Sequence, residues 1–253
     1  MYRSGEKSPL VNNSSKRTFY VIRVYDGNER IIFRILLSFL TIFLIYYILF
    51  SCPLFQRRES YKYYLMTKRW PIGECKFNNQ CFHNVSKYDK WVIHGLWPEY
   101  SNNTWDQFCT KNKFNLTIIK DLINDLNDNW PNLLSHKDVE SLWAHEWEKH
   151  GTCSPLNQRQ YFEKTLNFHK KNNVTKWLKQ ANIVPSSSLK YYSEQLRNAF
   201  PVDPRAVRFN CEIRNGESYL KEIYFCISFK DAETFVPCTV HSNCENPFYY
   251  PSL

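Results

Sequence analysis

Four side chains that could together bind a phosphate and move a proton lie within six residues: His145, Glu146, Lys149 and His150. On a helix, the pairs 145/149 and 146/150 are each four residues apart, so the four side chains lie on adjoining stripes of one surface. Glu146 is then within reach of His150. Because an imidazole exchanges protons near neutral pH, this spacing indicates acid-base chemistry on a phosphate.

The letters HEWEK also have a superficial similarity to the zinc-protease motif H-E-x-x-H. That motif needs a second histidine four residues after His145, where this chain has Lys149. His150 lies five residues away, about 140° around an ordinary helix, so we expect His145 and His150 not to share a metal. A membrane-tethered zinc hydrolase therefore stays a disfavoured alternative, and we predict a site with no metal and no cofactor.

A run of charges such as 145–150 is more often a solvated helix face than a site. Here Trp143 and Trp147 are interleaved with the charges, and Cys153 follows directly. We therefore expect this helix to be held against the core, with its polar groups in fixed positions.

A second candidate, His94, ends an apolar run in KWVIHGLWPEY. A lone histidine in such a place is more often structural than catalytic. Its neighbours favour a functional interpretation, because the flexible Gly95 and the indole of Trp97 place a titratable ring beside a surface on which a base could stack.

The elements that must position these groups are mixed. β-Branched and aromatic residues predict strands over 63–71, 90–98 and 218–230. Apolar residues at helical spacing predict helices over 117–130, 141–150 and 158–171. Because strands and helices do not alternate regularly, we predict an α+β fold with a central antiparallel sheet flanked by several helices.

The N-terminal part has a different composition. Residues 35–55 form an apolar stretch of about 21 residues, enough to cross a hydrocarbon core of about 30 Å as a helix. A buried core helix is rarely apolar on every face over this length. The preceding residues 1–34, with seven Lys/Arg and three Asp/Glu, are too long for an ordinary signal-peptide n-region, and no clear cleavage site follows.

These features predict a basic cytosolic tail at 1–34, a transmembrane signal-anchor at 35–55, a stalk at 56–68 and a catalytic domain at 69–253. The domain would face the lumen or the exterior, in the secretory or endolysosomal system, and would be secreted if the anchor were cleaved. Of the formal net charge of +9, the tail holds 7 − 3 = +4. The remaining +5 suits transient contact with a polyanion.

The cysteines and sequons agree with an oxidising compartment. Nine cysteines are more than a reduced cytosolic chain of this size normally carries, and none forms the paired C-x2-C spacing of a zinc knuckle. Disulfides are therefore favoured over zinc. The sequons predict glycosylation at Asn84, Asn102, Asn115 and Asn173.

The segments IHGLWPE and LWAHEWEKHGTC resemble the two active-site segments of the ribonuclease T2 family, and the similarity extends from RWPIGEC near residue 69 to the end of the chain, including DNWPNL at 128–133. The resemblance implies a monomeric endoribonuclease that cuts single-stranded RNA without metal, leaving 2′,3′-cyclic phosphate and 5′-hydroxyl ends. It makes His150 the base and His94 the acid, with Glu146, Lys149 and His145 around the phosphate.

The resemblance also implies four disulfides and leaves Cys52 over. The pairs are Cys75–Cys81, Cys109–Cys153, Cys211–Cys244 and Cys226–Cys238. Because one histidine must be charged and the other neutral, activity should follow a bell-shaped pH profile, with an acidic optimum as a hypothesis.

Two positions depart from the family pattern. Arg69 stands where many members have Gln, and Leu142 stands where an aromatic Phe often stacks on the base. Trp97 would then be the main aromatic face of the base site, so we predict low base specificity. An alternative is a catalytically weak, ribonuclease-like secreted or surface effector that acts by binding, which is disfavoured because every position of the catalytic motif is present.

Overall fold

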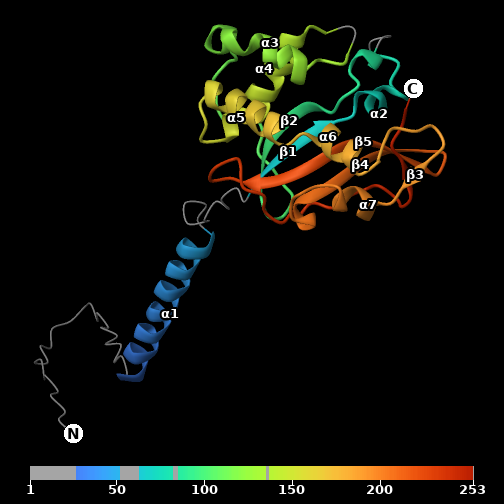
Figure 1. Cartoon of the computed structure of the whole chain (residues 1–253). Helices are drawn as coiled ribbons and strands as arrows, with labels where there is room; N and C mark the ends of the chain where they lie inside the picture. The colour runs from blue at the N-terminus through green and yellow to red at the C-terminus, as the bar shows by residue number, and fades with distance from the viewer. Residues whose placement is uncertain (1–26, 52–62, 82–84, 135–136, 253) are drawn as a thin grey trace, which may run out of the picture. The chain divides into compact units, whose positions relative to one another are not determined.

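The computed structural model describes residues 27–51, 63–81, 85–134 and 137–252. The chain divides into two compact units, residues 1–58 and 59–253, each considered by itself (Figure 1). The predicted glycosylation at Asn84 and the leftover Cys52 lie outside the described residues.

The first unit contains one long helix, α1 (Gly27–Ser51). Its window Ile31–Ile48 is long and apolar enough to cross a membrane, and none of that window is buried. At about 1.5 Å per residue, the helix spans about 37 Å. It begins eight residues before the predicted start at 35 and includes Arg34, while residues 52–55 lie outside the described part.

A six-stranded sheet forms the centre of the second unit. Strand β1 lies between β2 and β5, β4 pairs with β5, and two short strands extend the sheet at β6 and β3. The strands are β1 (Tyr63–Arg69), β2 (Val92–Glu99), β3 (Lys190–Tyr191), β4 (Val207–Arg214), β5 (Glu217–Ser228) and β6 (Phe248–Tyr249). All pairs are antiparallel except β5 with β6, so the predicted α+β fold is confirmed with one parallel pair added.

Strand β1 shows why the apolar run near residue 63 became a central strand. All of its residues are buried, since it has neighbours on both edges and packing on both faces. Tyr64 and Met66 point into the main core, whereas Tyr63 and Leu65 point into a smaller cluster with the disulfide of Cys226. Because β1 begins at Tyr63, the predicted stalk at 56–68 is wrong at its C-terminal end.

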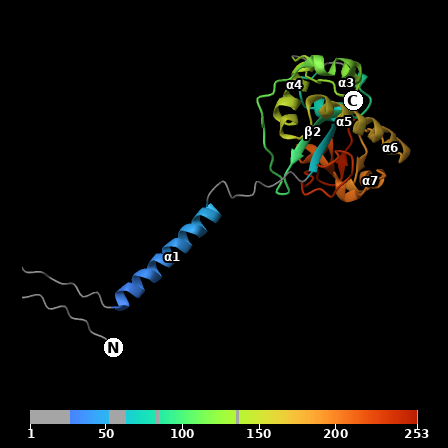
Figure 2. The ribbon, with the colours of Figure 1, turned by 90° about the vertical axis from the view of Figure 1, so that its left-hand side faces the viewer.

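Helices α3, α4 and α5 gather on one side of the sheet in both views (Figures 1 and 2). The α-helices of this unit are α2 (Pro71–Cys75), α3 (Ile123–Asn129), α4 (Val139–Lys149), α5 (Gln158–Lys171), α6 (Val174–Gln180) and α7 (Ser193–Asn198). The predicted helix over 117–130 is divided into a 3₁₀ segment, Leu116–Leu122, and α3, and the backbone leaves the helical region at Ile119 within the 3₁₀ segment.

Four disulfides join the pairs that the family resemblance implied. Cys109–Cys153 connects the loop after β2 to the residues that follow α4. In the same place, the backbone N–H of Phe108 donates to the carbonyl of Lys149, 3.0 Å away. Two independent links therefore hold the loop against the end of the helix that carries the candidate site.

Candidate active site

His94 lies at an irregularity in β2. In the β1–β2 pairing, Thr67 faces Gly95 and Lys68 faces Ile93, so His94 is an extra residue with no partner across the strand. Such a bulge redirects a side chain that regular pleating would place elsewhere. The ring is 28% exposed, and its Nδ1 atom is hydrogen-bonded to Oε1 of Glu222 on β5.

Glu222 is a functional candidate that sequence reasoning missed. It is buried, and its second oxygen accepts hydrogen bonds from Asn210 Nδ2 at 2.8 Å and Tyr224 Oη at 3.0 Å. Burial raises its pKa, but the charge and hydrogen bond of His94, the charge of Arg69 and the Asn210 bond outweigh burial and lower the pKa to about 2. The carboxylate is therefore ionised. The single carboxylate inside the largely apolar strand SYLKEIYFCISFK was the signal that could have identified it.

Trp97 lies between the two candidate histidines. Its ring centroid is 5.0 Å from that of His94 and 5.2 Å from that of His150. Its Nε1 atom donates to Glu146 Oε2 at 2.8 Å. The indole also packs against the smaller apolar cluster. Trp97 therefore sets the spacing between β2, which carries His94, and α4, which carries Glu146, in addition to any role in stacking on a base.

Gly95 is required for space. A Cβ atom there would lie 2.2 Å from Glu146 Oε2 and 2.3 Å from Trp97 Nε1, far inside contact distance. The sequence interpretation stressed flexibility at this glycine, but the structure shows close approach as the reason for it. Only a residue without a side chain lets the indole and the carboxylate meet against the strand.

Helix α4 carries the second half of the site. It begins at Val139, with the Asp138 side chain accepting from the Ser141 N–H, and ends at Lys149. His150 follows with φ −114° and ψ −48°, outside regular helical geometry. The His145 and His150 ring centroids are 6.4 Å apart, and ligand-type atoms of His145, Glu146 and His150 all lie within 4.8 Å of one another.

The expectation that helix geometry keeps His145 and His150 apart is therefore wrong. The 140° separation applies to a continuous helix, and His150 has already left it. The surroundings nevertheless favour an anion over a cation. The charge of Lys149 acts on both histidines and that of Lys137 on His145, while one Glu146 oxygen is already held by Trp97.

Burial and nearby positive charge disfavour the protonated form of both histidines on this side of the site. Burial, followed by the charges of Lys149, His145 and His94, lowers the pKa of His150 to about 3. Burial also lowers the pKa of His145, despite the opposing charge of Glu146. The Nδ1 atom of His150 is buried and has no hydrogen-bond partner among the described residues. His150 is thus a neutral imidazole at mildly acidic pH.

Arg69 and Leu142 are the two positions that depart from the family pattern. Arg69 lies next to Glu222. It is 6% exposed and faces Glu222 across the β1–β5 pairing, and its Nε and Nη2 atoms have no partner within the described residues. Leu142 is partly buried and packs against the main core. The sequon residues Asn102, Asn115 and Asn173 are all exposed.

Comparison with known proteins identifies the family. Residues 61–238 match the model of the Ribonuclease T2 family. The intracellular ribonuclease LX of Solanum lycopersicum is 30% identical over 204 residues, which is 77% of this chain and 86% of that protein. Ribonuclease T2-A of Mus musculus is 31% identical over 191 residues, covering 71% of this chain and 70% of that protein.

Solved structures agree with these relatives. The crystal structure of RNase NT in complex with 5′-AMP superposes with a TM-score of 0.68 at 28% identity, covering 77% of this chain and all of that one. Ribonuclease MC1 from bitter gourd seeds gives a TM-score of 0.67 at 26% identity, covering 75% of this chain and 100% of that one. These matches support an endoribonuclease activity on RNA. The chain belongs to the ribonuclease T2 family.

Proposed function

We propose that this protein is a membrane-anchored endoribonuclease that cuts single-stranded RNA by acid-base transphosphorylation without a metal. One observation carries the proposal: a neutral, buried His150 and a carboxylate-paired His94 lie on either side of Trp97. Cleavage through the 2′-hydroxyl needs one group that accepts a proton and one that donates it. His150 is suited to accept the proton and His94 is suited to donate one, so the pair supplies both groups.

His150 is the base in this account. Its low pKa keeps the ring unprotonated in mild acid, so it can accept the proton of the 2′-hydroxyl. The 2′-oxygen then forms a bond to phosphorus while the bond from phosphorus to the 5′-oxygen breaks. The products are a 2′,3′-cyclic phosphate end and a 5′-hydroxyl end.

His94 is the acid that protonates the leaving 5′-oxygen. Because its Nδ1 atom donates to Glu222, its Nε2 atom is the one that can give the proton away. The buried carboxylate fixes the ring's orientation and stabilises its protonated form, in the way a carboxylate orients the histidine of a hydrolase triad. Glu222 is therefore a positioning residue that acts through His94.

The remaining polar groups surround the phosphate. Lys149 supplies positive charge for the developing phosphorane, His145 donates a hydrogen bond to its oxygens, and Glu146 orients the groups around it. Glu146 is held in place by Trp97 Nε1. Trp97, Leu142 and Arg69 form the base-contacting side, and with a single aromatic ring among them we propose low base specificity.

The N-terminal unit anchors the enzyme. We propose that residues 1–34 lie in the cytosol, that 35–55 cross the membrane and that a short stalk leads to the domain from Tyr63 onward. Four disulfides suit the lumen or the exterior, where thiols are oxidised. The domain then acts as a monomer in the secretory or endolysosomal system, with glycans on the exposed sequons Asn102 and Asn115.

The test incubates the full-length chain in non-ionic detergent with single-stranded RNA and with DNA of the same sequence, and identifies the product ends by mass spectrometry. We expect RNA fragments with 2′,3′-cyclic phosphate and 5′-hydroxyl ends, similar rates on the four homopolymers, and intact DNA. Cleaved DNA or 5′-phosphate ends would contradict the chemistry, and a sharp preference for one base would contradict the specificity.

A further inference from the structure

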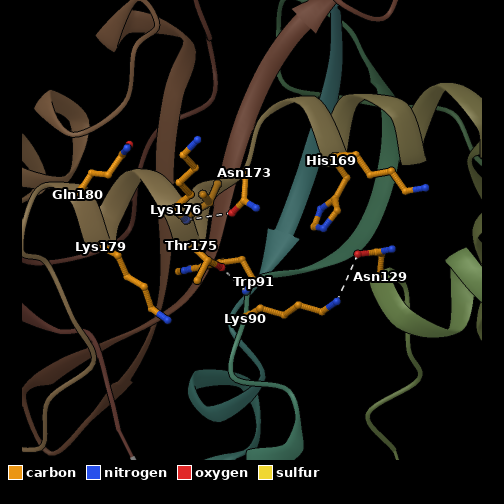
Figure 3. Close-up of a pocket in the computed structure, with 11 residues that line it drawn as sticks. Lys90, Trp91, Asn129, His169, Asn173, Thr175, Lys176, Lys179 and Gln180 are labelled. Atoms are coloured by element: carbon orange, nitrogen blue, oxygen red, sulfur yellow. Dashed lines mark hydrogen bonds between the residues drawn. The ribbon is translucent and has the colours of Figure 1, made fainter.

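A hollow lies at the start of β2, away from the candidate histidines. It has a volume of about 650 Å³ and lies between the first residues before β2, the C-terminal end of α5 and helix α6 (Figure 3). Four lysines line it, together with amide and hydroxyl side chains. The lysines are Lys90, Lys170, Lys176 and Lys179.

The positive charge of the lysines that line this hollow is not balanced by acidic side chains among the described residues of the lining. No carboxylate is among its lining residues in the part of the chain that the structure describes. Lys170 forms an ion pair with Asp125 at 2.7 Å, and Lys90 donates to Asn129 at 3.4 Å. Lys176 and Lys179 are exposed on α6. The hollow therefore presents net positive charge to an incoming ligand.

A buried histidine points to a ligand with hydrogen-bonding oxygens. His169 is only 8% exposed and lines the hollow, and its Nδ1 atom has no hydrogen-bond partner among the described residues. Figure 3 shows its ring directed into the space above Lys90. Buried polar atoms are nearly always paired, so an unpaired ring nitrogen in a basic hollow is suited to an anionic oxygen.

A neighbouring hollow lies between this one and the residues around His145. A second hollow of about 630 Å³ shares Lys90 and is also lined by Lys87 and Lys137, with two aspartates. Lys137 lies close enough to His145 for its charge to lower that residue's pKa. Lys90 lies two residues before β2 and four residues before His94, so their Cα atoms are at most about 14 Å apart.

We propose that the hollow between β2, α5 and α6 is a distal phosphate-binding site that holds the backbone of the same RNA strand several nucleotides from the cut. The proposal rests on the function proposed above and deepens it. A polynucleotide fits best because the two hollows share Lys90, Lys137 of the second hollow acts on His145, and a backbone brings a phosphate at every nucleotide. Bases are not read at this site.

One sequon bears on the experiment. Asn173 lines the hollow, and its side chain caps α6 by accepting from the Lys176 N–H at 2.9 Å. A glycan on Asn173 would cover the rim, so the proposed site requires this sequon, unlike Asn102 and Asn115, to be unmodified. The protein for the test is therefore the full-length chain produced in a host that adds no N-glycans, and is kept in non-ionic detergent.

Binding is measured with a labelled twenty-nucleotide 2′-deoxy oligonucleotide, which cannot be cut because it lacks the 2′-hydroxyl. The double variant Lys176→Gln/Lys179→Gln removes two charges from the hollow, and Lys120→Gln/Lys230→Gln removes two exposed charges elsewhere. We expect the first to weaken binding several-fold and to flatten the slope of log K against log salt by about 1.4, or about 0.7 for each lost phosphate contact. The control should bind like the wild type.

Turnover provides the second readout. For a twenty-nucleotide RNA, the hollow variant should raise KM and leave kcat unchanged, while its kcat/KM for a dinucleotide should equal that of the wild type. Unchanged affinity and KM for the long strand would overturn the proposal, as would an equal loss on the dinucleotide. A wild type that binds the oligonucleotide through the hollow but cuts no RNA would instead overturn the proposed function.

Vesicles containing phosphatidylserine separate this ligand from a membrane surface. We expect the hollow variant to bind them as the wild type does. If the two substitutions weaken vesicle binding and leave oligonucleotide binding intact, the hollow contacts anionic lipid and the RNA proposal is wrong.

Discussion

The Nδ1 atom of His94 is hydrogen-bonded to Oε1 of Glu222, a buried carboxylate two strands away. Two irregularities make this contact possible. His94 is the extra residue of the β2 bulge, and in β5 an extra residue, Lys221, precedes Glu222, since Asn210 faces Glu222 and Cys211 faces Leu220. The pair thus depends on local departures from regular pleating in both strands.

The first prediction concerns this pair. Glu222→Gln should lower kcat by less than the factor of about 10²–10⁴ that a general acid contributes, because the acid stays but loses its carboxylate. KM should stay unchanged, since Glu222 holds the ring that donates the proton and does not touch the substrate. Tyr224→Phe, which removes one donor to Glu222 and keeps the His94 contact, is the control. An unchanged kcat in Glu222→Gln would mean that the carboxylate is only structural.

The second prediction concerns the acid limb. Because the pKa of His150 is lowered to about 3, the base should stay available in mild acid, and activity should fall only near that pH. Lys149→Gln removes a charge that opposes protonation of His150, so the acid limb should move to higher pH while kcat also drops. Lys111→Gln, on an exposed loop, should leave the profile unchanged. An acid limb that stays in place in Lys149→Gln would contradict the electrostatic account.

The third prediction tests the close approach at Gly95. Gly95→Ala places a methyl group 2.2 Å from the Glu146 carboxylate, so Trp97 and Glu146 must separate and kcat/KM should fall by at least tenfold. Gly216→Ala is a matched control, because Gly216 has φ +75° and open space around it. The control should lose about 1 kcal/mol of stability through its backbone and keep its activity. Full activity in Gly95→Ala would show that the contact is not needed.

The fourth prediction links stability to pH through Glu99, at the end of β2. Burial raises the pKa of this carboxyl from 4.5 to about 8, so the folded protein holds a proton that the unfolded chain releases above its usual pKa. Its contribution to stability is therefore complete below about 4.5 and is lost as the pH rises through 8. The free energy of unfolding of Glu99→Gln, relative to that of the wild type, should therefore rise from pH 5 to pH 8.

Denaturant unfolding with intact disulfides measures that difference, with Glu140→Gln, an exposed position on α4, as the control. A difference that does not change between the two pH values would show that Glu99 is ionised in the folded protein. The expected direction would make the domain relatively more stable in an acidic lumen.

Local patterns predicted most of the elements that carry the site. The strands around residues 63 and 92 and helix α5 follow from side-chain type and periodicity, because each buries a continuous apolar surface. The break at Ile119 could not be predicted in this way, because it depends on tertiary packing, which outweighs local preference.

The parts of the site that sequence reasoning missed are those that depend on contacts between distant strands. The spacing of His145, Glu146 and His150 was informative, but it assumed a continuous helix, and His150 lies beyond the helix end. Glu222 is 128 residues from His94 in sequence, and only the register of β2, β1 and β5 brings them together. No local pattern encodes that register.

The most direct measurement of the central claim is RNA cleavage by the full-length protein at mildly acidic pH in EDTA, for the wild type, His94→Ala and His150→Ala. We predict that the wild type retains its activity in EDTA and that each substitution lowers kcat by a factor of about 10²–10⁴. Undiminished cleavage by both variants would contradict the two-histidine mechanism, and loss of wild-type activity in EDTA would show that the cluster of His145, Glu146 and His150 works through a metal.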